Sequence, residues 1–244
     1  MYLLHVKDIK FLIESIDIMT LQLDGIANQI SSELDSDGRS LTDIRRTAVK
    51  DIVATMLFLQ WQYIHLAEGL LHYPWWDEHG FANLTPEQKM DNASGYFTYT
   101  AFSAFHHGYS TYEGCLRQIH YSLDPVGLNQ STDGIYKVFN ALITNFGLSI
   151  NVSKFKELHI FLGLMRNTIH NIGCYRNANE PVKEVIYKGI SYRFEHLKPV
   201  LFFYPEMLSH IVYDIGVMLA DLIRDPIVMA LPDARNPYRD NLVS

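Results

Sequence analysis

The sequence predicts an all-α fold, a helical bundle with a long helical N-terminal extension and a small β-hairpin between its last two helices. Two segments, about 7–33 and 205–225, repeat apolar residues at alternating steps of three and four, the spacing of an amphipathic helix. A single segment, 182–194, alternates apolar and polar residues around Lys188-Gly189 and predicts the hairpin. Such a strand-poor pattern is typical of a bundle.

The N-terminal part is expected to form two helices. The first, about 7–33, carries a heptad-like seam suited to a bundle or to a helix-mediated dimer. The second is expected from a cap at Ser40 to about Tyr73, where Pro74 ends it. Residues 74–94 contain Pro, Gly and Asn and predict an irregular connector. The seam of the first helix consists of Ile9, Leu12, Ile16, Met19, Leu23, Ile26 and Ile30.

Four further helices are expected. They cover about 95–122, 133–147, 152–174 and 205–225, with Asn151 or Ser153 as the cap of the third and Pro226 as the end of the fourth. This division predicts an N-terminal helical extension (1–90), a bundle (91–227) and a loosely held tail (228–244).

Composition restricts the function classes. A net charge of -7 excludes a basic, non-specific coat for nucleic acid but leaves room for a local cationic cleft. Two cysteines, Cys115 and Cys174, are too few for a disulfide framework, so we expect buried thiols in a reducing cytoplasm. No secretory signal and no bilayer-spanning apolar stretch is evident, so no membrane partner is expected.

The helix expected over 152–174 has two contrasting faces. At about 100° per residue, a polar stripe falls within an arc of roughly 100°, opposite the apolar seam. Arg166 and His170 are four residues apart, so both side chains can reach one ligand, and a fixed cation beside an imidazole suits a phosphodiester. Gly163 weakens a helix by about 1 kcal/mol, which indicates a groove floor or a dimer contact. The stripe consists of Lys156, His159, Gly163, Arg166, Asn167 and His170. Equally, such a face is often merely solvated.

The segment Arg166-Asn167-Thr168-Ile169-His170-Asn171 resembles the signature of HEPN domains, in which an Arg is followed directly by Asn, Asp or His and four to six residues separate that Arg from a His. Here three residues separate Arg166 from His170, one fewer than the family minimum. The segment FSAFHHGYSTYEGCLRQI is similar to the first core helix of that family.

The resemblance implies an up-and-down bundle and a cytoplasmic homodimer that binds RNA or a nucleotide, or cleaves RNA without a metal or other cofactor. Many members are toxins or phage-defence effectors, so an antitoxin-type protein partner is also implied. Carried over by position, His170 is the general base or acid, Arg166 stabilises phosphate charge, and Asn167 orients either of them or binds phosphate. The accessory candidates are Glu113, His159 and Asn171. Glu113 has an alternative role, a local pair with Arg117.

Two rival hypotheses lead to other functions. A metal site built from His210, Asp214 and Asp221 lacks the zincin and di-iron signatures, and a local pair of His210 with Asp214 is the simpler interpretation. The second rival is a non-catalytic helical dimerisation or interaction protein in which Arg166 and His170 are structural. That hypothesis requires both side chains to be sealed by packing, whereas the enzyme hypothesis requires them to be open to a cleft.

Overall fold

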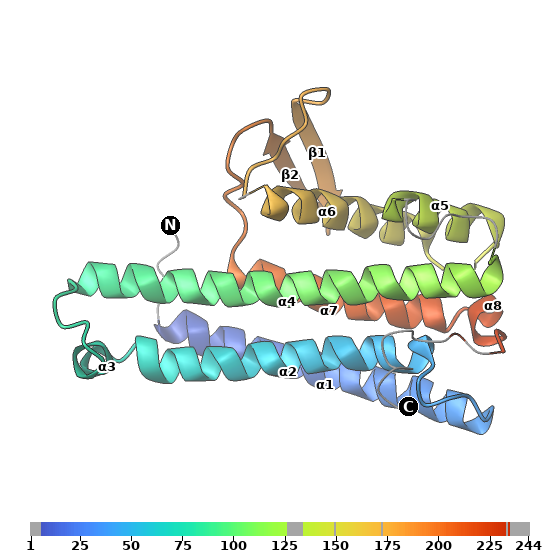
Figure 1. Ribbon diagram of the computed structural model, residues 1–244, viewed down its shortest axis with the longest axis horizontal. Helices are drawn as coiled ribbons and strands as arrows, with labels where there is room; N and C mark the ends of the chain where they lie inside the picture. The colour runs from blue at the N-terminus through green and yellow to red at the C-terminus, as the bar shows by residue number, and fades with distance from the viewer. Residues whose placement is uncertain (1–5, 126–133, 149, 172, 233, 235–244) are drawn as a thin grey trace.

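The computed structural model of the protein describes residues 6–125, 134–148, 150–171, 173–232 and 234 (Figure 1). Within these residues the chain is mainly helical, and one two-stranded antiparallel hairpin lies between its last two long helices. The predicted all-α class with an inserted hairpin is therefore confirmed. None of the described helices combines the length and the apolar composition that crossing a bilayer requires.

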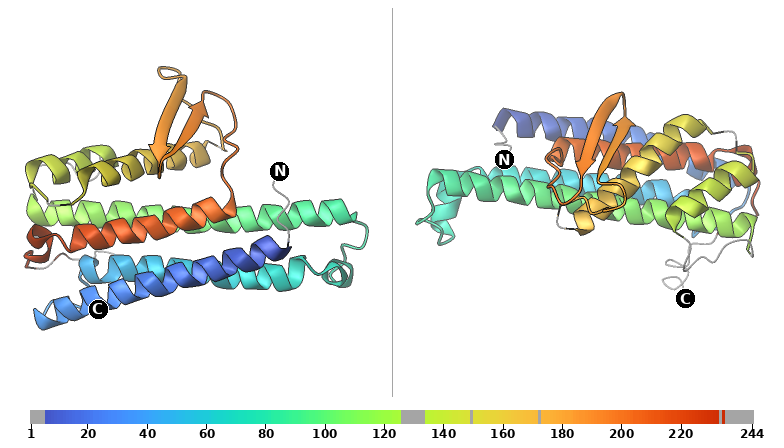
Figure 2. Two further views of the ribbon diagram at one scale, coloured as in Figure 1. Left: turned by 180° about the vertical axis from the view of Figure 1, so that it is seen from behind. Right: turned by 90° about the horizontal axis from the view of Figure 1, so that it is seen from above.

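The helices form three layers (Figure 1). The outer layer pairs α1 (Val6–Ser36) with α2 (Ile44–Leu70), and the middle layer pairs α4 (Pro86–Leu123) with α7 (Pro205–Ile223). On the opposite side of the middle layer lie α5 (Ile135–Asn145), α6 (Val152–His170) and the hairpin, as both views in Figure 2 show. Helix α6 is thus held against α4, with its free side turned away from the N-terminal helices.

The apolar seam predicted for α1 is buried except at Ile26, which is half-buried, and Ile16 and Leu23 are fully covered. The start predicted for α2 was wrong, because its cap is Asp43 rather than Ser40. The Asp43 carboxylate accepts the backbone N–H of Arg45 at 2.9 Å, and it also holds the Arg45 guanidinium at 2.6 Å. Both side chains are fully buried, so α2 begins at an internal ion pair that the sequence pattern does not reveal.

This ion pair also fastens the C-terminal segment. Arg45 donates to the backbone carbonyls of Val228 and Leu231, each at 2.9 Å, and the backbone N–H of Ala234 donates to Asp43 at 3.1 Å. The segment after α8 (Pro226–Met229) is therefore attached to α2, and the expectation of a loosely held tail was wrong up to residue 234. The rest of that predicted tail, 235–244, lies outside the described residues.

The connector predicted over 74–94 is partly helical. It holds α3 (Tyr73–Glu78) and the first turns of α4, both with proline in the first turn. A proline there costs no hydrogen bond, so Pro74 and Pro86 begin helices instead of ending them. Helix α4 crosses the predicted boundary at residue 90, and one continuous core includes residues from α1 and α2 as well as α4, α6 and α7. The division into extension and bundle stays a prediction.

The hairpin is formed by β1 (Val182–Tyr187) and β2 (Ile190–Glu195), with Val185 opposite Tyr192. Its two-residue turn has positive φ at Lys188 (51°) and Gly189 (74°), as tight hairpin turns require. Stacking fixes the hairpin to α6, since the Phe161 ring lies 4.7 Å from that of Tyr187 and 4.8 Å from that of Tyr192.

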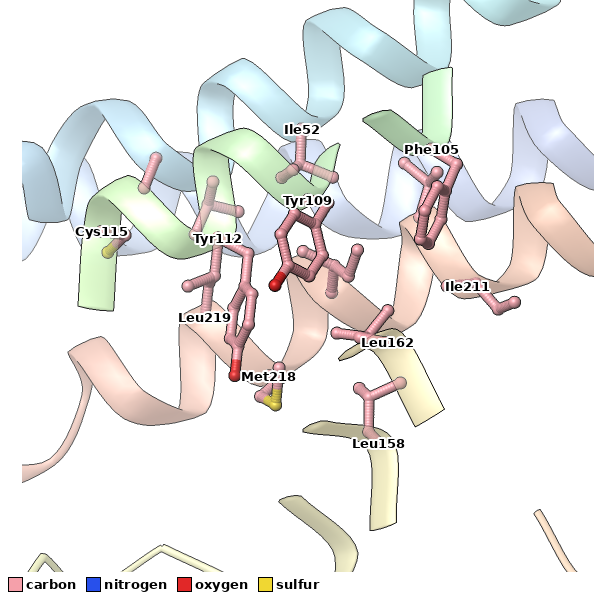
Figure 3. Close-up of a cluster of buried hydrophobic side chains, with 14 of the residues drawn as sticks. Ile52, Phe105, Tyr109, Tyr112, Cys115, Leu158, Leu162, Ile211, Met218 and Leu219 are labelled. Atoms are coloured by element: carbon pink, nitrogen blue, oxygen red, sulfur yellow. The ribbon is translucent and has the colours of Figure 1, made fainter. Parts of the chain in front are cut away.

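Aromatic residues of α4 join the middle layer to α6 (Figure 3). The rings of Tyr109 and Tyr112 extend from α4 toward Leu162 of α6 and Met218 of α7, and all four side chains are buried. Burial of each such apolar side chain contributes about 1.5–3 kcal/mol to the stability of the fold. Cys115 lies in the same core, as expected, whereas Cys174, which follows the end of α6, is only half-buried, so the expectation of a buried thiol was wrong there.

Candidate functional site

Helix α6 carries the predicted motif in its last two turns. Its apolar seam faces the core, with Phe155, Leu158, Leu162 and Met165 buried. The helix begins at the predicted cap, where the Asn151 side chain accepts the backbone N–H of Lys154 at 3.2 Å. It ends at His170, earlier than the predicted Cys174, and Gly173 follows with a φ of 77°.

A cleft of about 490 Å³ lies between α4, α5, α6 and the first strand, and we call it the α4–α6 cleft. Helix α4 contributes Tyr109 and Glu113, and α6 contributes Gly163, Arg166 and Asn167. No described atom beyond the neighbouring helix backbone lies within 4 Å of the place where a Gly163 Cβ would be, so the glycine is open to the cleft. The remaining wall consists of Gly134, Ile135, Tyr136, His159, Ile160, Leu164 and Lys183.

Arg166 is half-buried in this wall, and its guanidinium donates to the Asn167 side-chain oxygen at 3.3 Å. The charge of Arg166 reaches α4, where it acts on Tyr109. Burial, reinforced by Glu113, raises the pKa of the Tyr109 phenol to about 12, against the opposing effect of Arg166. Tyr109 is therefore a neutral hydrogen-bond donor at physiological pH, beside a permanent cation.

His170 lies one turn beyond Arg166 and is exposed. Its ring packs edge-on against that of His106 on α4, with centroids 5.1 Å apart and an interplanar angle of 77°. The pKa of His106 is lowered, mainly by burial and to a smaller extent by the nearby His170 and Arg166. The sequence pattern did not predict this pairing of His106 with His170. One signal was available, because His106 precedes Tyr109 by three residues and Glu113 by seven and so shares their helix face.

His159, predicted as an accessory residue, is placed in the cleft wall but is only 3% exposed. Its ring stacks on Phe139 at 4.2 Å and on Tyr136 at 5.5 Å, and its Nδ1 lies 2.5 Å from the Tyr112 hydroxyl. Burial lowers the pKa of His159 to about 4, so the ring is neutral near pH 7. His159 therefore shapes the cleft wall and presents no titratable face to it.

The other two accessory candidates have structural partners. The Asn171 side chain donates to the Asn167 carbonyl at 2.7 Å and so closes the end of α6. Glu113 accepts from the Arg117 guanidinium at 2.7 Å, which confirms the local pair considered as its alternative role. Since Glu113 also lines the cleft, its carboxylate is present there with its charge balanced by Arg117.

The residues considered for a metal site are engaged elsewhere or dispersed. Asp214 accepts from the Tyr187 hydroxyl and pairs with Lys188 at 2.7 Å, which ties α7 to the hairpin turn. Among the described residues, no three His, Cys, Asp or Glu side chains gather as metal ligands would.

Comparison of the chain with protein-family models, with curated proteins and with solved structures found no match.

Proposed function

We propose that the protein binds RNA at the α4–α6 cleft and cleaves it without a metal ion. The observation that carries this proposal is the position of Arg166, which lines a cleft of about 490 Å³ while His170 stands exposed one turn further on. Pockets for small ligands and nucleotides have volumes of about 300–1,000 Å³. The resemblance to the HEPN signature supports the same chemistry.

In this proposal Arg166 binds the scissile phosphate and stabilises the charge that builds on it in the transition state. His170 moves a proton at the reacting ribose or leaving oxygen, as an imidazole does near neutral pH. Asn167, whose side-chain oxygen accepts from Arg166, holds the guanidinium in place. Attack of the 2′-hydroxyl on phosphorus yields a 2′,3′-cyclic phosphate and a 5′-hydroxyl end.

The rest of the cleft suits the nucleoside beside that phosphate. Tyr136 is 49% exposed and offers a ring for stacking, an interaction worth about 1–3 kcal/mol per base. Ile160 and Leu164 provide apolar walls, and Lys183, whose ammonium pairs with Glu180 at 2.7 Å, also lines the cleft. The positive charge of Arg166 in this wall is compatible with the acidic chain as a whole.

From the resemblance we extend the proposal to a cytoplasmic homodimer of the toxin or defence type, with an antitoxin-type protein as partner.

A non-catalytic interaction protein is the second candidate, and exposed apolar side chains on the outer layer favour it. There the apolar side chains of Phe11, Ile18 and Leu21 on α1 and of Phe58 and Trp61 on α2 are more than half exposed, at 58–66%. Under this alternative Arg166 and His170 are structural, and a second chain would have to cover both side chains.

The test is degradation of mixed single-stranded RNAs in EDTA by the purified protein and by His170→Ala. We expect the wild type to cut and the variant to lose at least about 100-fold in rate, the usual effect of removing a general acid or base. His107→Ala, an exposed histidine of α4, is the matched control and should cut normally. Intact RNA with the wild type, or equal cutting by His170→Ala, refutes the nuclease.

A further inference from the structure

Two imidazoles from different helices meet one turn of α6 beyond Arg166, outside the set of residues that line the α4–α6 cleft. The rings of His106 on α4 and His170 on α6 are 5.1 Å apart, edge to face, and Arg166 acts on the same histidine from the preceding turn of α6. His106 is half-buried and His170 is exposed, so one ring is held by packing while the other meets solvent.

We propose that His106 and His170 are the two proton-transfer residues of one ribonuclease site, both supplied by the same chain. This inference rests on the proposed function and deepens it. A homodimeric cleft with one histidine per chain obtains its second proton-transfer group from the partner, whereas here α4 supplies that group to α6. Each chain then carries a complete site, and dimerisation is not required for the chemistry.

The two groups divide the reaction between them. One imidazole removes the proton from the ribose 2′-hydroxyl as the oxygen attacks phosphorus. The phosphorus–O5′ bond breaks, and the other imidazole, protonated, gives its proton to the leaving O5′. The products are a 2′,3′-cyclic phosphate and a 5′-hydroxyl, and exchange of protons with water restores both rings. No oxidant, reductant or metal enters this balance.

The surroundings assign the roles. The groups that face His106 are His170 and Arg166 of α6, with Tyr109 one turn further along its own helix. Burial, followed by the electrostatic effects of His170 and Arg166, lowers the pKa of His106, which favours the neutral ring that a general base needs. His170 is the exposed partner ring in the last turn of α6, which leaves it the role of general acid. His106 therefore takes the 2′-hydroxyl proton, and His170 protonates the leaving oxygen.

The test compares His106→Asn and His170→Asn on two substrates, a short single-stranded RNA and uridine 3′-(4-nitrophenyl phosphate). The nitrophenolate leaves without protonation, so only the general base is needed for the second substrate. We expect both variants to lose at least about 100-fold in kcat on RNA, with little change in KM. On the nitrophenyl ester His170→Asn should recover most of the wild-type rate, whereas His106→Asn should not. His107→Asn, the exposed neighbour on α4, is the matched control.

The pH profile and a mixing experiment complete the test. The bell-shaped profile of kcat/KM should lose its acidic limb in His106→Asn, a change that a merely structural residue does not cause. An equimolar mixture of the two variants should stay inactive, because no chain in it has both histidines. Recovery of activity on mixing would place the two rings in different chains and overturn the inference.

The failures are distinguishable. If the wild type leaves both substrates intact, the proposed function falls, and this inference with it. If the wild type cuts RNA and His170→Asn does not, while His106→Asn keeps the wild-type kcat and pH profile, only the role of His106 is overturned. Circular dichroism of each variant verifies that the fold is retained, and a folded His106→Asn that behaves as the wild type is decisive against the proposal.

Discussion

Protonation of His159 should destabilise the fold as the pH falls through the weakly acidic range. An unperturbed histidine has a pKa near 6.5, and burial lowers that of His159 to about 4. The folded state therefore resists a proton that the unfolded chain accepts, so the free energy of unfolding is highest above pH 6.5 and falls toward pH 4. Linkage gives a loss of about 2 kcal/mol between pH 7.5 and pH 5, and about 3 kcal/mol below pH 4.

The assay is urea unfolding followed by circular dichroism at pH 7.5 and pH 5 for the wild type and for His159→Asn. Asparagine places a polar atom near the histidine Nδ1, so the Tyr112 hydroxyl keeps a partner, but it does not titrate. Carboxylates and other histidines contribute to both proteins, and the difference between them isolates His159. His107→Asn, which removes an exposed histidine, should keep the wild-type dependence. Equal losses in the wild type and in His159→Asn would show that His159 does not carry this pH dependence.

Three further predictions concern the ion pair and the glycines. Arg45→Ala should lower the free energy of unfolding by about 3–5 kcal/mol, since it leaves the Asp43 carboxylate buried without its cation. Arg193→Ala removes one member of an ion pair whose side chains are 56% and 58% exposed, so in the same urea titration it should lower the free energy of unfolding by at most about 1 kcal/mol. Gly216→Ala should cost about 1–3 kcal/mol, because the new methyl group would lie 2.8 Å from a Leu23 methyl in the closed core; an unchanged melting curve would contradict this packing. Gly163→Ala meets open space and should stabilise the fold by up to about 1 kcal/mol while weakening RNA binding, measured by fluorescence anisotropy; unchanged affinity would exclude Gly163 from the binding surface.

The sequence alone predicts those elements of the fold that a local pattern of residues determines. The seam of α1 and the Lys188-Gly189 turn follow from periodicity and from the φ values that a tight turn needs. Pro74 and Pro86 misled the prediction because proline both ends helices and begins them, and the pattern alone does not separate the two cases.

The site was predictable only in part, for a different physical reason. Arg166, Asn167 and His170 share one helix face, so their proximity follows from helical spacing. The contact between His106 and His170 depends on how α4 packs against α6, which is a tertiary relation. His159 belongs to the same stripe by spacing, yet the rings of Phe139 and Tyr136 enclose it once α5 has docked.

The central claim is that the α4–α6 cleft cleaves RNA by attack of a ribose 2′-hydroxyl, with Arg166 on the phosphate and a histidine moving the proton. Its most direct test is an end-labelled single-stranded RNA incubated in EDTA and compared with the same RNA carrying one 2′-deoxy substitution at the nucleotide that is cut. We expect fragments with 2′,3′-cyclic phosphate ends from the first RNA, no cut at the substituted position in the second, and no fragments with Arg166→Ala. Fragments with 3′-hydroxyl ends, cutting at the deoxy position, or full activity in Arg166→Ala would contradict it.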